Sequence, residues 1–223
     1  MKKVGVVVLN YKNYEETIKC VLSVLKQNKI LLKIVIVDNG SNNESVGKLT
    51  DAFENNNTIN VLTNRENLGY AQGNNVGITF LLNAGFDFIV VCNSDVFFPS
   101  ENILSDMVDY DGEEVGVITP IIKNLDGSIE MRAQYSSKLF PLRIFKELKK
   151  MQSLSCKNHK TKNGKTKMEL LSPGVQDKYY VITGSIFALT PSFFKHYNGL
   201  FPETFLYVEE LATLLLVYKA RLK

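Results

Sequence analysis

The chain has 223 residues, of which 45% are hydrophobic and 22% are charged, and its net charge is +3. This composition is that of an ordinary globular protein and excludes a disordered or fibrous chain. The length suffices for one sizeable α/β core and an additional segment that is too short to form a second independent domain, so a single domain is expected.

Three features bound the compartment of the protein. Cys20, Cys92 and Cys156 are widely spaced and fit neither a disulfide framework nor a CxxC metal site, so reduced thiols in the cytoplasm are expected. No run of about eighteen apolar residues occurs, so no segment is expected to span a bilayer. The apolar run after the N-terminal lysines stops at Asn10, which indicates a first strand and not a signal peptide.

The first half of the chain alternates short apolar runs with helical patterns. Val4–Leu9 and Lys33–Val37 are typical of strands buried on both faces of a parallel sheet, and Tyr14–Gln27 between them carries apolar residues at helical spacing. The alternation continues with helices expected at Ser45–Glu54 and Gln72–Asn83 and strands at Ile59–Leu62, Asp87–Cys92 and Val115–Thr119. This order predicts an α/β fold with a doubly wound parallel sheet and helices on both faces.

From Ile121 the regular alternation ends. The second half is expected to contain a hairpin turn at Asn124–Gly127, a mixed apolar and basic stretch at Phe140–Leu154, an exposed loop at Ser155–Lys167, a strand pair or one long strand at Tyr179–Leu189, and a short helix at Pro191–Tyr197. Between residues 143 and 167 there are nine Lys or Arg residues against one acid, so the positive charge of the chain is local.

Several common enzyme classes lack their signatures here. The turn after the first strand, Leu9–Asn13, has no GxGxxG pattern, which argues against a nicotinamide dehydrogenase. No GxxxxGK[ST] loop exists, so a P-loop NTPase is disfavoured. The two histidines, His159 and His196, support neither a zinc site nor a Ser-His-Asp triad.

Two carboxylates follow predicted strands directly. Asp38 ends the second strand and Asp95 lies just past the fourth, so both are expected at the same edge of the sheet, where they can share a ligand. Asp38 suits hydrogen bonds from a base or ribose. The alternative for Asp38–Ser41 is a turn with a helix cap, and Asn93–Asp95 alone is equally compatible with a loop cap.

Five segments in order carry a family resemblance. They are Val6–Tyr11, Val37–Ser41, Asn67–Gly77, Asn93–Asp95, and Gly184–Phe187 taken with Gly199–Glu203 and Tyr207–Glu210. Through them the chain resembles family 2 glycosyltransferases of the GT-A fold, in a pattern similar to bacterial enzymes called rhamnosyltransferase-like. The resemblance implies one Rossmann-like, mostly parallel sheet with a small mixed β region. It also implies a nucleotide-sugar-binding half at 1–120 and an acceptor-side half at 121–223.

The resemblance also implies roles on the donor side. Asp38 would contact the nucleotide base, and Asp95, in the position of the family's DxD-type motif, would ligate Mg²⁺ or Mn²⁺. Asn93 is neutral, which leaves one carboxylate in that motif. The set expected to bind the donor is Leu9, Asn10, Tyr11, Asp38, Asn67, Gly73, Asn74, Asn75, Asn93, Ser94 and Asp95. Arg65 is also expected to face the donor.

On the acceptor side, the resemblance implies that Glu210 is the catalytic base, with Glu209 beside it. The alternative is a pair of ordinary acidic residues in the first turn of a helix. Relatives usually have a further Asp two positions on and a polar, arginine-bearing helix, whereas this chain has Leu211–Leu216. They also usually continue with more helices, so a chain that is truncated, degenerate or frame-altered at this end is expected.

The implied function is inverting transfer of a hexose from a UDP- or dTDP-sugar to a glycan or lipid-linked oligosaccharide in bacterial surface polysaccharide synthesis. No nucleic acid partner is expected. The alternatives are a non-catalytic nucleotide-sugar-binding remnant and a nucleotidyltransferase, which would need a glycine- and Lys/Arg-rich loop after the first strand that is absent. A cytoplasmic location is expected. For the basic segment 143–167, a solvated loop and a contact with the inner face of the membrane both stay open.

Overall fold

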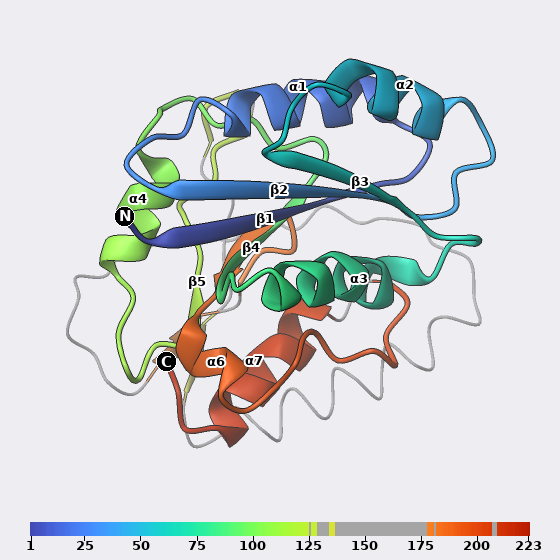
Figure 1. Cartoon of the computed structure of the whole chain (residues 1–223). Coiled ribbons are helices and arrows are strands. Elements are labelled where there is room, and N and C mark those ends of the chain that lie inside the picture. The colour runs from blue at the N-terminus through green and yellow to red at the C-terminus, as the bar shows by residue number, and fades with distance from the viewer. Residues whose placement is uncertain (125, 129–133, 137–177, 181, 207–208) are drawn as a thin grey trace. The chain divides into compact units, whose positions relative to one another are not determined.

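A computed structural model describes residues 1–124, 126–128, 134–136, 178–180, 182–206 and 209–223 (Figure 1). They divide into two compact units, one made of Met1–Pro120 with Thr183–Lys223 and the other of Ile121–Ile182. The expected boundary at 120 is therefore also a boundary between units, but residues 183–223 group with the first 120 residues. The single domain stays a prediction.

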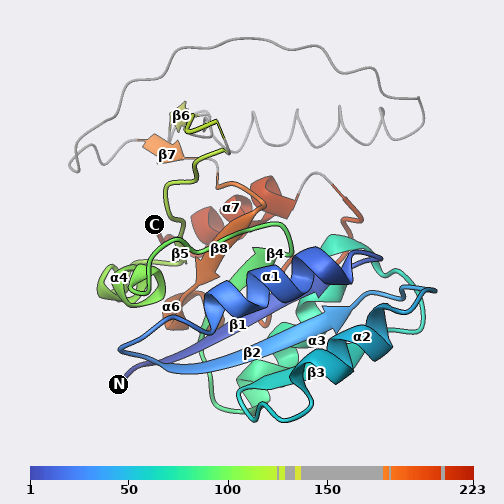
Figure 2. The same ribbon diagram turned by 90° about the horizontal axis from the view of Figure 1, so that it is seen from above.

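The first unit contains a six-stranded sheet. Its strands are β1 (Lys3–Asn10), β2 (Leu31–Asp38), β3 (Ile59–Thr63), β4 (Phe88–Asn93), β5 (Val117–Ile118) and β8 (Ile186–Leu189), in the order β3-β2-β1-β4-β8-β5 (Figure 2). β1 pairs in parallel with β2 and β4, and β2 pairs in parallel with β3. β8 runs antiparallel to both β4 and β5. The mostly parallel α/β sheet expected from the sequence is confirmed.

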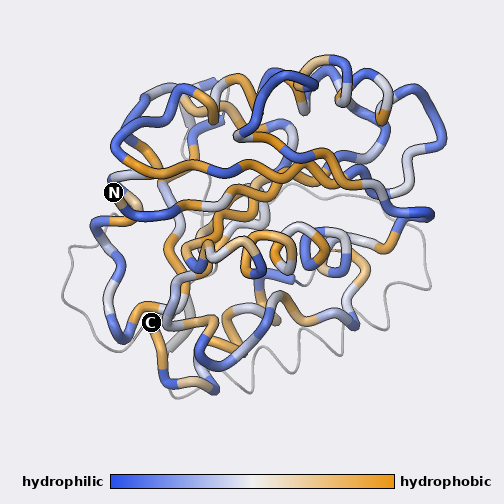
Figure 3. Tube along the Cα trace, in the orientation of Figure 1, coloured by the Kyte–Doolittle hydropathy of each residue, from blue (hydrophilic) through white to orange (hydrophobic). Residues whose placement is uncertain are grey.

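Helices cover both faces of this sheet. They are α1 (Tyr14–Val24), α2 (Ser45–Phe53), α3 (Gly69–Asn83), α4 (Ile103–Asp109), α6 (Pro191–Phe194) and α7 (Glu209–Lys219). α1 and α2 lie on one face and α3 on the other (Figure 1). The hydrophobic stretches gather in the central strands, where Val6–Val8, Ile34–Val37 and Ile89–Cys92 are completely buried (Figure 3). This burial on both faces explains why their sequences are continuously apolar.

Helix boundaries differ from the expected ones by a few residues. α1 begins after Asn13, whose side chain accepts a hydrogen bond from the backbone of Glu16, and it ends at Val24, three residues before the expected end. Gln27 instead bridges two backbone groups beyond β4, because its amide donates to the carbonyl of Ser100 and accepts from the N–H of Leu104. α3 begins at Gly69, three residues earlier than expected, and α4 was not expected at all.

The second unit contains β6 (Gln134–Ser136) paired antiparallel with β7 (Lys178–Tyr180). The expected turn at Asn124–Gly127 is confirmed, because the N–H of Gly127 donates to the carbonyl of Asn124 at 2.9 Å. Of the two alternatives expected at Tyr179–Leu189, the single long strand is wrong. Two strands, β7 and β8, occur there, but they belong to different sheets and do not pair with each other. The mixed apolar and basic stretch at 140–154, the expected loop at 155–167 and the basic segment 143–167 all lie outside the described residues. No helix in the described part of the chain is long and apolar enough to cross a bilayer.

Candidate active site

The carboxyl ends of three central strands bring the predicted donor-side residues to one edge of the sheet. In the register of the sheet, Asn10 of β1 lies opposite Asp38 of β2, and Leu9 lies opposite Asn93 of β4. Ligands of open parallel sheets bind beyond this edge. Asp38 and the Asn93–Asp95 motif are therefore neighbours across β1, as the strand pattern predicts.

Asp38 is completely buried and belongs to a hydrogen-bond network. The side-chain amide of Asn10 donates to Oδ2 of Asp38 at 2.6 Å, and the backbone N–H of Ser41 donates to Oδ1 at 2.9 Å. The Thr17 hydroxyl of α1 donates to Oδ1 of Asn10 at 2.7 Å, which orients the Asn10 amide. Asp38 thus fixes the ends of β1 and β2, and its contact with a base stays a prediction.

Asn39, which the sequence placed in a turn and in a segment of the family resemblance without a role of its own, connects the end of β2 to the loop before α3. Its Nδ2 donates to Oδ1 of Asn67 at 2.9 Å and to the carbonyl of Gly69 at 3.0 Å. Its Oδ1 accepts from the Asn64 amide at 2.9 Å and from the N–H of Leu68 at 3.2 Å. The predicted donor residue Asn67 is therefore engaged in holding this loop.

Tyr11 and Lys12 directly follow β1 at this edge of the sheet, and both are exposed. Tyr11 is 44% exposed, and the Lys12 ammonium lies 5.0 Å from the centre of its ring. The Lys12 side chain, followed by the Asn67 side chain, lowers the pKa of Tyr11. The Lys12 backbone is fixed at φ 64° by a hydrogen bond from its N–H to the Ser41 hydroxyl at 2.7 Å. An exposed aromatic ring beside a cation can stack on a planar, anionic ligand.

The three α3 residues predicted to bind the donor make internal contacts. Gly73 packs so closely on β1 that a methyl group there would lie 2.8 Å from the Leu9 side chain. Asn74 is completely buried, and its amide donates to the carbonyl of Tyr70 at 2.9 Å. Asn75 forms two hydrogen bonds with the backbone of Leu200. The structure thus places them in the packing of α3, and their contact with a donor stays a prediction.

The Asn93–Asp95 motif begins where β4 meets β8. The N–H of Asn93 donates to the carbonyl of Ser185 at 2.8 Å, whereas Asp95 is exposed. No group of three His, Cys, Asp or Glu side chains that could hold a metal occurs in the part of the chain that the structure describes. The motif offers one carboxylate with an amide and a hydroxyl oxygen. This oxygen set fits a Mg²⁺ or Mn²⁺ ion that takes its other ligands from a diphosphate and water.

Glu209 and Glu210 open α7, where the N-terminal dipole favours acidic residues. Glu209 is buried, and Glu210 is half-buried with its carboxylate against Gly184. The Tyr70 hydroxyl donates to the carbonyl of Gly184 at 2.6 Å. Burial raises the pKa of Tyr70 well above its ordinary value, and the negative charge of Glu210 raises it further. An acid, a neutral phenol and a glycine therefore lie together at the start of α7, and the role of Glu210 as the base stays a prediction.

The apolar sequence of α7, which departs from the family pattern, has a packing reason. Leu211, Ala212, Leu214 and Val217 are buried, and Val217 and Leu222 pack on Gly116 just before β5. The helix is thus part of the core of the first unit. A polar, arginine-bearing helix would not fit this environment.

The sequence of residues 5–163 matches the family described as glycosyl transferase family 2. The chain belongs to this family. A curated relative in the same class, glycosyltransferase GlyG of Streptococcus pneumoniae serotype 4 (strain ATCC BAA-334 / TIGR4), is 34% identical over 93 residues. That stretch covers 41% of this chain and 30% of GlyG, so the match spans under a third of the curated relative's length.

A solved structure of a glycosyltransferase shares the fold. The mannosyltransferase PcManGT from Pyrobaculum calidifontis, in complex with GDP-Man and Mn²⁺, aligns with a TM-score of 0.62 at 14% identity. The alignment covers 96% of this family 2 chain but 51% of PcManGT. S. aureus TarS in complex with UDP-GlcNAc aligns over 56% of the chain and 36% of TarS, with a TM-score of 0.47 and 23% identity. The fold of this chain is of the GT-A type.

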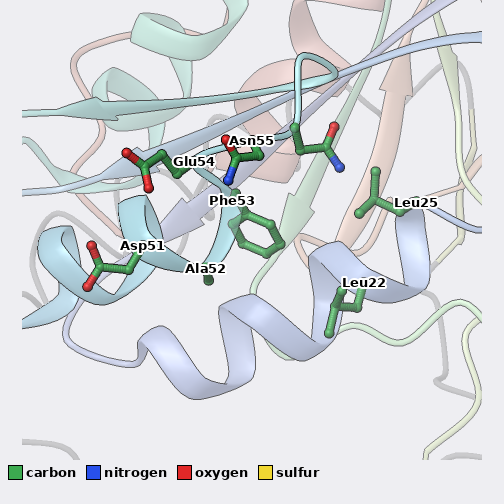
Figure 4. Close-up of a pocket in the computed structure, with 8 residues that line it drawn as sticks. Leu22, Leu25, Asp51, Ala52, Phe53, Glu54 and Asn55 are labelled. Carbon is green, nitrogen blue, oxygen red and sulfur yellow. The ribbon is translucent and has the colours of Figure 1, made fainter.

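A surface pocket of about 290 Å³ lies elsewhere on this family 2 chain (Figure 4). It is lined by Leu22 and Leu25 at the end of α1 and by residues 51–56 at the end of α2. These helix ends lead into β2 and β3, so the pocket is at the edge of the sheet opposite to the strand carboxyl ends. The candidate site does not include it.

Sequence reasoning missed three residues that organise the site: Thr17, Asn39 and Tyr70. Each is a polar side chain whose partner is a backbone or amide group on another element. Asn39 and Tyr70 stand inside the segments that carry the family resemblance, which is the signal that pointed to their neighbourhood. Their partners depend on the fold and are not encoded in the spacing.

Proposed function

We propose that this chain transfers a sugar from a nucleotide-sugar donor to a glycan or lipid-linked acceptor, with inversion at the anomeric carbon. One relationship supports this most directly. Gly184 contacts the Glu210 carboxylate, and the next residue, Ser185, pairs with Asn93 of the donor-side motif. A candidate base and a candidate diphosphate site are thus joined through two consecutive residues.

The reaction would be a single displacement. Glu210 accepts the proton of the acceptor hydroxyl while that oxygen attacks the anomeric carbon and the bond to the nucleoside diphosphate breaks. Glu209 is buried next to Glu210 at the start of α7, and its backbone carbonyl accepts a hydrogen bond from the Thr213 hydroxyl at 2.7 Å. Tyr70 stays neutral near Glu210 because burial raises its pKa.

The donor would bind at the strand edge. The Tyr11 ring stacks on the base, and the Asn10–Asp38 pair with the backbone of Leu9 shapes the pocket beneath it. Asn67 and Gly73 bring the start of α3 close to that pocket through their contacts with Asn39 and Leu9. Asn74 and Asn75 are proposed to contact the donor from the same helix. UDP- and dTDP-linked hexoses are the proposed donors.

Asp95, with Asn93 and Ser94, would hold a Mg²⁺ or Mn²⁺ ion together with the donor. When bound, such an ion supplies positive charge that stabilises the departing diphosphate. Asp95 is the exposed carboxylate of the motif, so it can reach a ligand without rearrangement of β4. The neutral Asn93 makes this protein's share of the metal site small, and we expect weak binding in the absence of donor.

Thermal unfolding with UDP, dTDP, GDP and their common sugars, with and without Mn²⁺, tests the donor site. A ligand at a hundred times its dissociation constant stabilises a protein by about 2.7 kcal/mol. We expect a shift of the midpoint for one nucleotide that requires the metal and is lost in Asp95→Ala. An absence of shift with every ligand, from a cooperatively unfolding sample, would contradict the proposal.

A non-catalytic nucleotide-sugar-binding remnant is the second candidate. It is favoured by the apolar sequence of α7, which stands where the family has a polar, arginine-bearing helix. Glu210→Gln separates the two functions. Loss of transfer with unchanged donor affinity supports catalysis, whereas donor binding without any transfer by the parent supports the remnant.

We also propose that the enzyme acts in surface polysaccharide synthesis on the cytoplasmic side of the membrane. The support is the charge of the 143–167 segment, with nine basic residues against one acid. Each Lys or Arg near an anionic bilayer contributes about 1 kcal/mol to binding. Deletion of this segment should abolish binding to vesicles that contain anionic lipid, and unchanged binding would rule out the membrane contact.

A further inference from the structure

The Glu210 carboxylate packs directly against Gly184. A methyl group on Gly184 would collide with Oε1 of Glu210 and lie 3.0 Å from its Cδ. Gly184 is not among the glycines with a positive φ, so its backbone conformation does not itself require glycine. The need for glycine at this position therefore comes from the carboxylate of Glu210.

Tyr70 forms a hydrogen bond with the carbonyl group of Gly184. Its hydroxyl donates to the carbonyl of Gly184 at 2.6 Å, and its own backbone N–H donates to the carbonyl of Phe205 at 2.9 Å. Phe205 lies in the loop that leads into α7. Tyr70 thus joins the Gly184 peptide to the segment that precedes Glu210, across a sequence separation of 114 residues.

Ser185 extends this connection to the donor side. Its carbonyl accepts a hydrogen bond from the N–H of Asn93 at 2.8 Å, where β4 pairs with β8. The peptides of Gly184 and Ser185 therefore contact Tyr70, Glu210 and Asn93. These two consecutive residues therefore connect the candidate base to the strand edge.

We propose that Gly184 and Tyr70 are positioning residues that fix the Glu210 carboxylate relative to the Asn93–Asp95 motif. This inference rests on the proposed function of Glu210 as the base. Gly184 provides the space that the carboxylate occupies, and Tyr70 keeps the Gly184 peptide from shifting. A role in packing alone would affect stability, whereas positioning affects turnover.

Gly184→Ala is the first test. The atom that the new methyl group meets is the far end of a flexible side chain, so Glu210 rotates away and the fold remains. A misplacement of about 1 Å can cost about a hundredfold in rate. We expect kcat to fall by about tenfold to a hundredfold, with the KM for the donor and the unfolding midpoint unchanged.

Gly47→Ala is the matched control. Gly47 is in α2, and a methyl group there meets no atom within 4 Å. This variant undergoes the same chemical change without a collision, so its kcat should equal that of the parent. A Gly184→Ala variant with the same kcat as Gly47→Ala would overturn the inference.

Tyr70→Phe and a paired substitution provide the second test. Tyr70→Phe keeps the ring and removes one hydrogen bond, so kcat should fall about twofold to tenfold while the donor KM stays constant. Glu210→Asp shortens the acid and makes room for the methyl group of Gly184→Ala. The fold loss of activity in the double variant Gly184→Ala/Glu210→Asp should therefore be smaller than the product of the two single fold losses. A double variant whose loss equals that product would contradict direct contact between residues 184 and 210.

The outcomes separate this inference from the proposed function. If Glu210→Gln keeps full activity, or the parent transfers no sugar, the proposed function fails and the positioning role fails with it. If Glu210→Gln is inactive while Gly184→Ala and Tyr70→Phe keep full activity, only the positioning role fails.

Discussion

Asn75 holds Leu200 through both ends of its side-chain amide. Its Nδ2 donates to the carbonyl of Leu200 at 2.9 Å, and the N–H of Leu200 donates to its Oδ1 at 2.7 Å. The pair attaches the loop before α7 to α3, 125 residues away in the sequence. The Asn75 side chain thus pairs with both backbone groups of Leu200, as a neighbouring strand would in a sheet.

Asn75→Ala should lower the free energy of unfolding by about 1–3 kcal/mol, because both backbone groups of the buried Leu200 lose their partner. Urea unfolding measures the change. Gln72→Ala is the control, since Gln72 makes one exposed hydrogen bond to the carbonyl of Pro202 and should cost less than about 1 kcal/mol. Equal stability of Asn75→Ala and the parent would show that the pair does not stabilise the fold.

Asp38→Ala and Asp38→Asn should differ in stability. Asp38→Ala leaves the buried Asn10 amide and the N–H of Ser41 without an acceptor, at a cost of about 1–3 kcal/mol. In Asp38→Asn the Asn10 amide can turn over, so that its oxygen accepts from the new amide and its nitrogen donates to the Thr17 hydroxyl. We expect this variant to lose under about 1 kcal/mol in urea unfolding.

Thr17→Val tests that explanation. Without the Thr17 hydroxyl the turned Asn10 amide has no acceptor, so Asp38→Asn should be more harmful in a Thr17→Val background than in the parent. Equal losses in both backgrounds would contradict the rearrangement.

The central strands β1, β2 and β4 could be predicted from the sequence because they are buried on both faces. Each expected strand of the parallel part overlaps an observed one, and β2 and β4 differ from expectation by two residues or fewer at either end. α4 escaped prediction because its seven residues are too few for a helical period to emerge. α3 began earlier than expected because the chain enters it through Gly69 at φ 79°, which does not resemble a helix start in sequence.

The site could be predicted only in part. The edge on which Asp38 and Asn93 meet follows from strand order, since the carboxyl ends of parallel strands share one edge. The contacts within the site do not follow. Tyr70 and Gly184 are 114 residues apart, and no local pattern relates a phenol to a distant carbonyl.

The stability of the protein should fall in alkaline solution through Tyr70. Burial, followed by the charge of Glu210, raises the pKa of Tyr70 in the folded state, so the folded protein keeps the phenol proton longer than the unfolded chain. Below the ordinary pKa of about 10 the contribution is fully present. As the pH rises from there toward the folded-state pKa, the contribution is lost, at up to about 1.4 kcal/mol per pH unit.

Urea unfolding of the parent and of Tyr70→Phe between about pH 8 and pH 11 isolates this effect. The upper limit lies about one pH unit above the ordinary pKa of tyrosine. The other tyrosines are the same in both proteins. The difference in the free energy of unfolding should be constant up to about pH 10 and shrink above it. A constant difference over the whole range would show that the Tyr70 pKa is not raised by folding.

Cys20 and Cys92 should be unreactive toward thiol reagents in the folded protein. Their sulfur atoms lie 3.9 Å apart, and both residues are buried between α1 and β4. Burial, followed by the neighbouring Cys20 thiol, raises the pKa of Cys92 well above its ordinary value, so little reactive thiolate forms at pH 8, about half a unit below the ordinary thiol pKa.

A Cys156→Ser variant leaves these two as the only thiols of the chain. With 5,5′-dithiobis(2-nitrobenzoic acid) at that same pH we expect both to react only as the protein unfolds, at a rate that rises with urea in step with the unfolding transition. Because α1 must separate from β4 before either sulfur is reached, both thiols should react together. Fast reaction of one thiol without urea would mean that this helix and strand open independently of global unfolding.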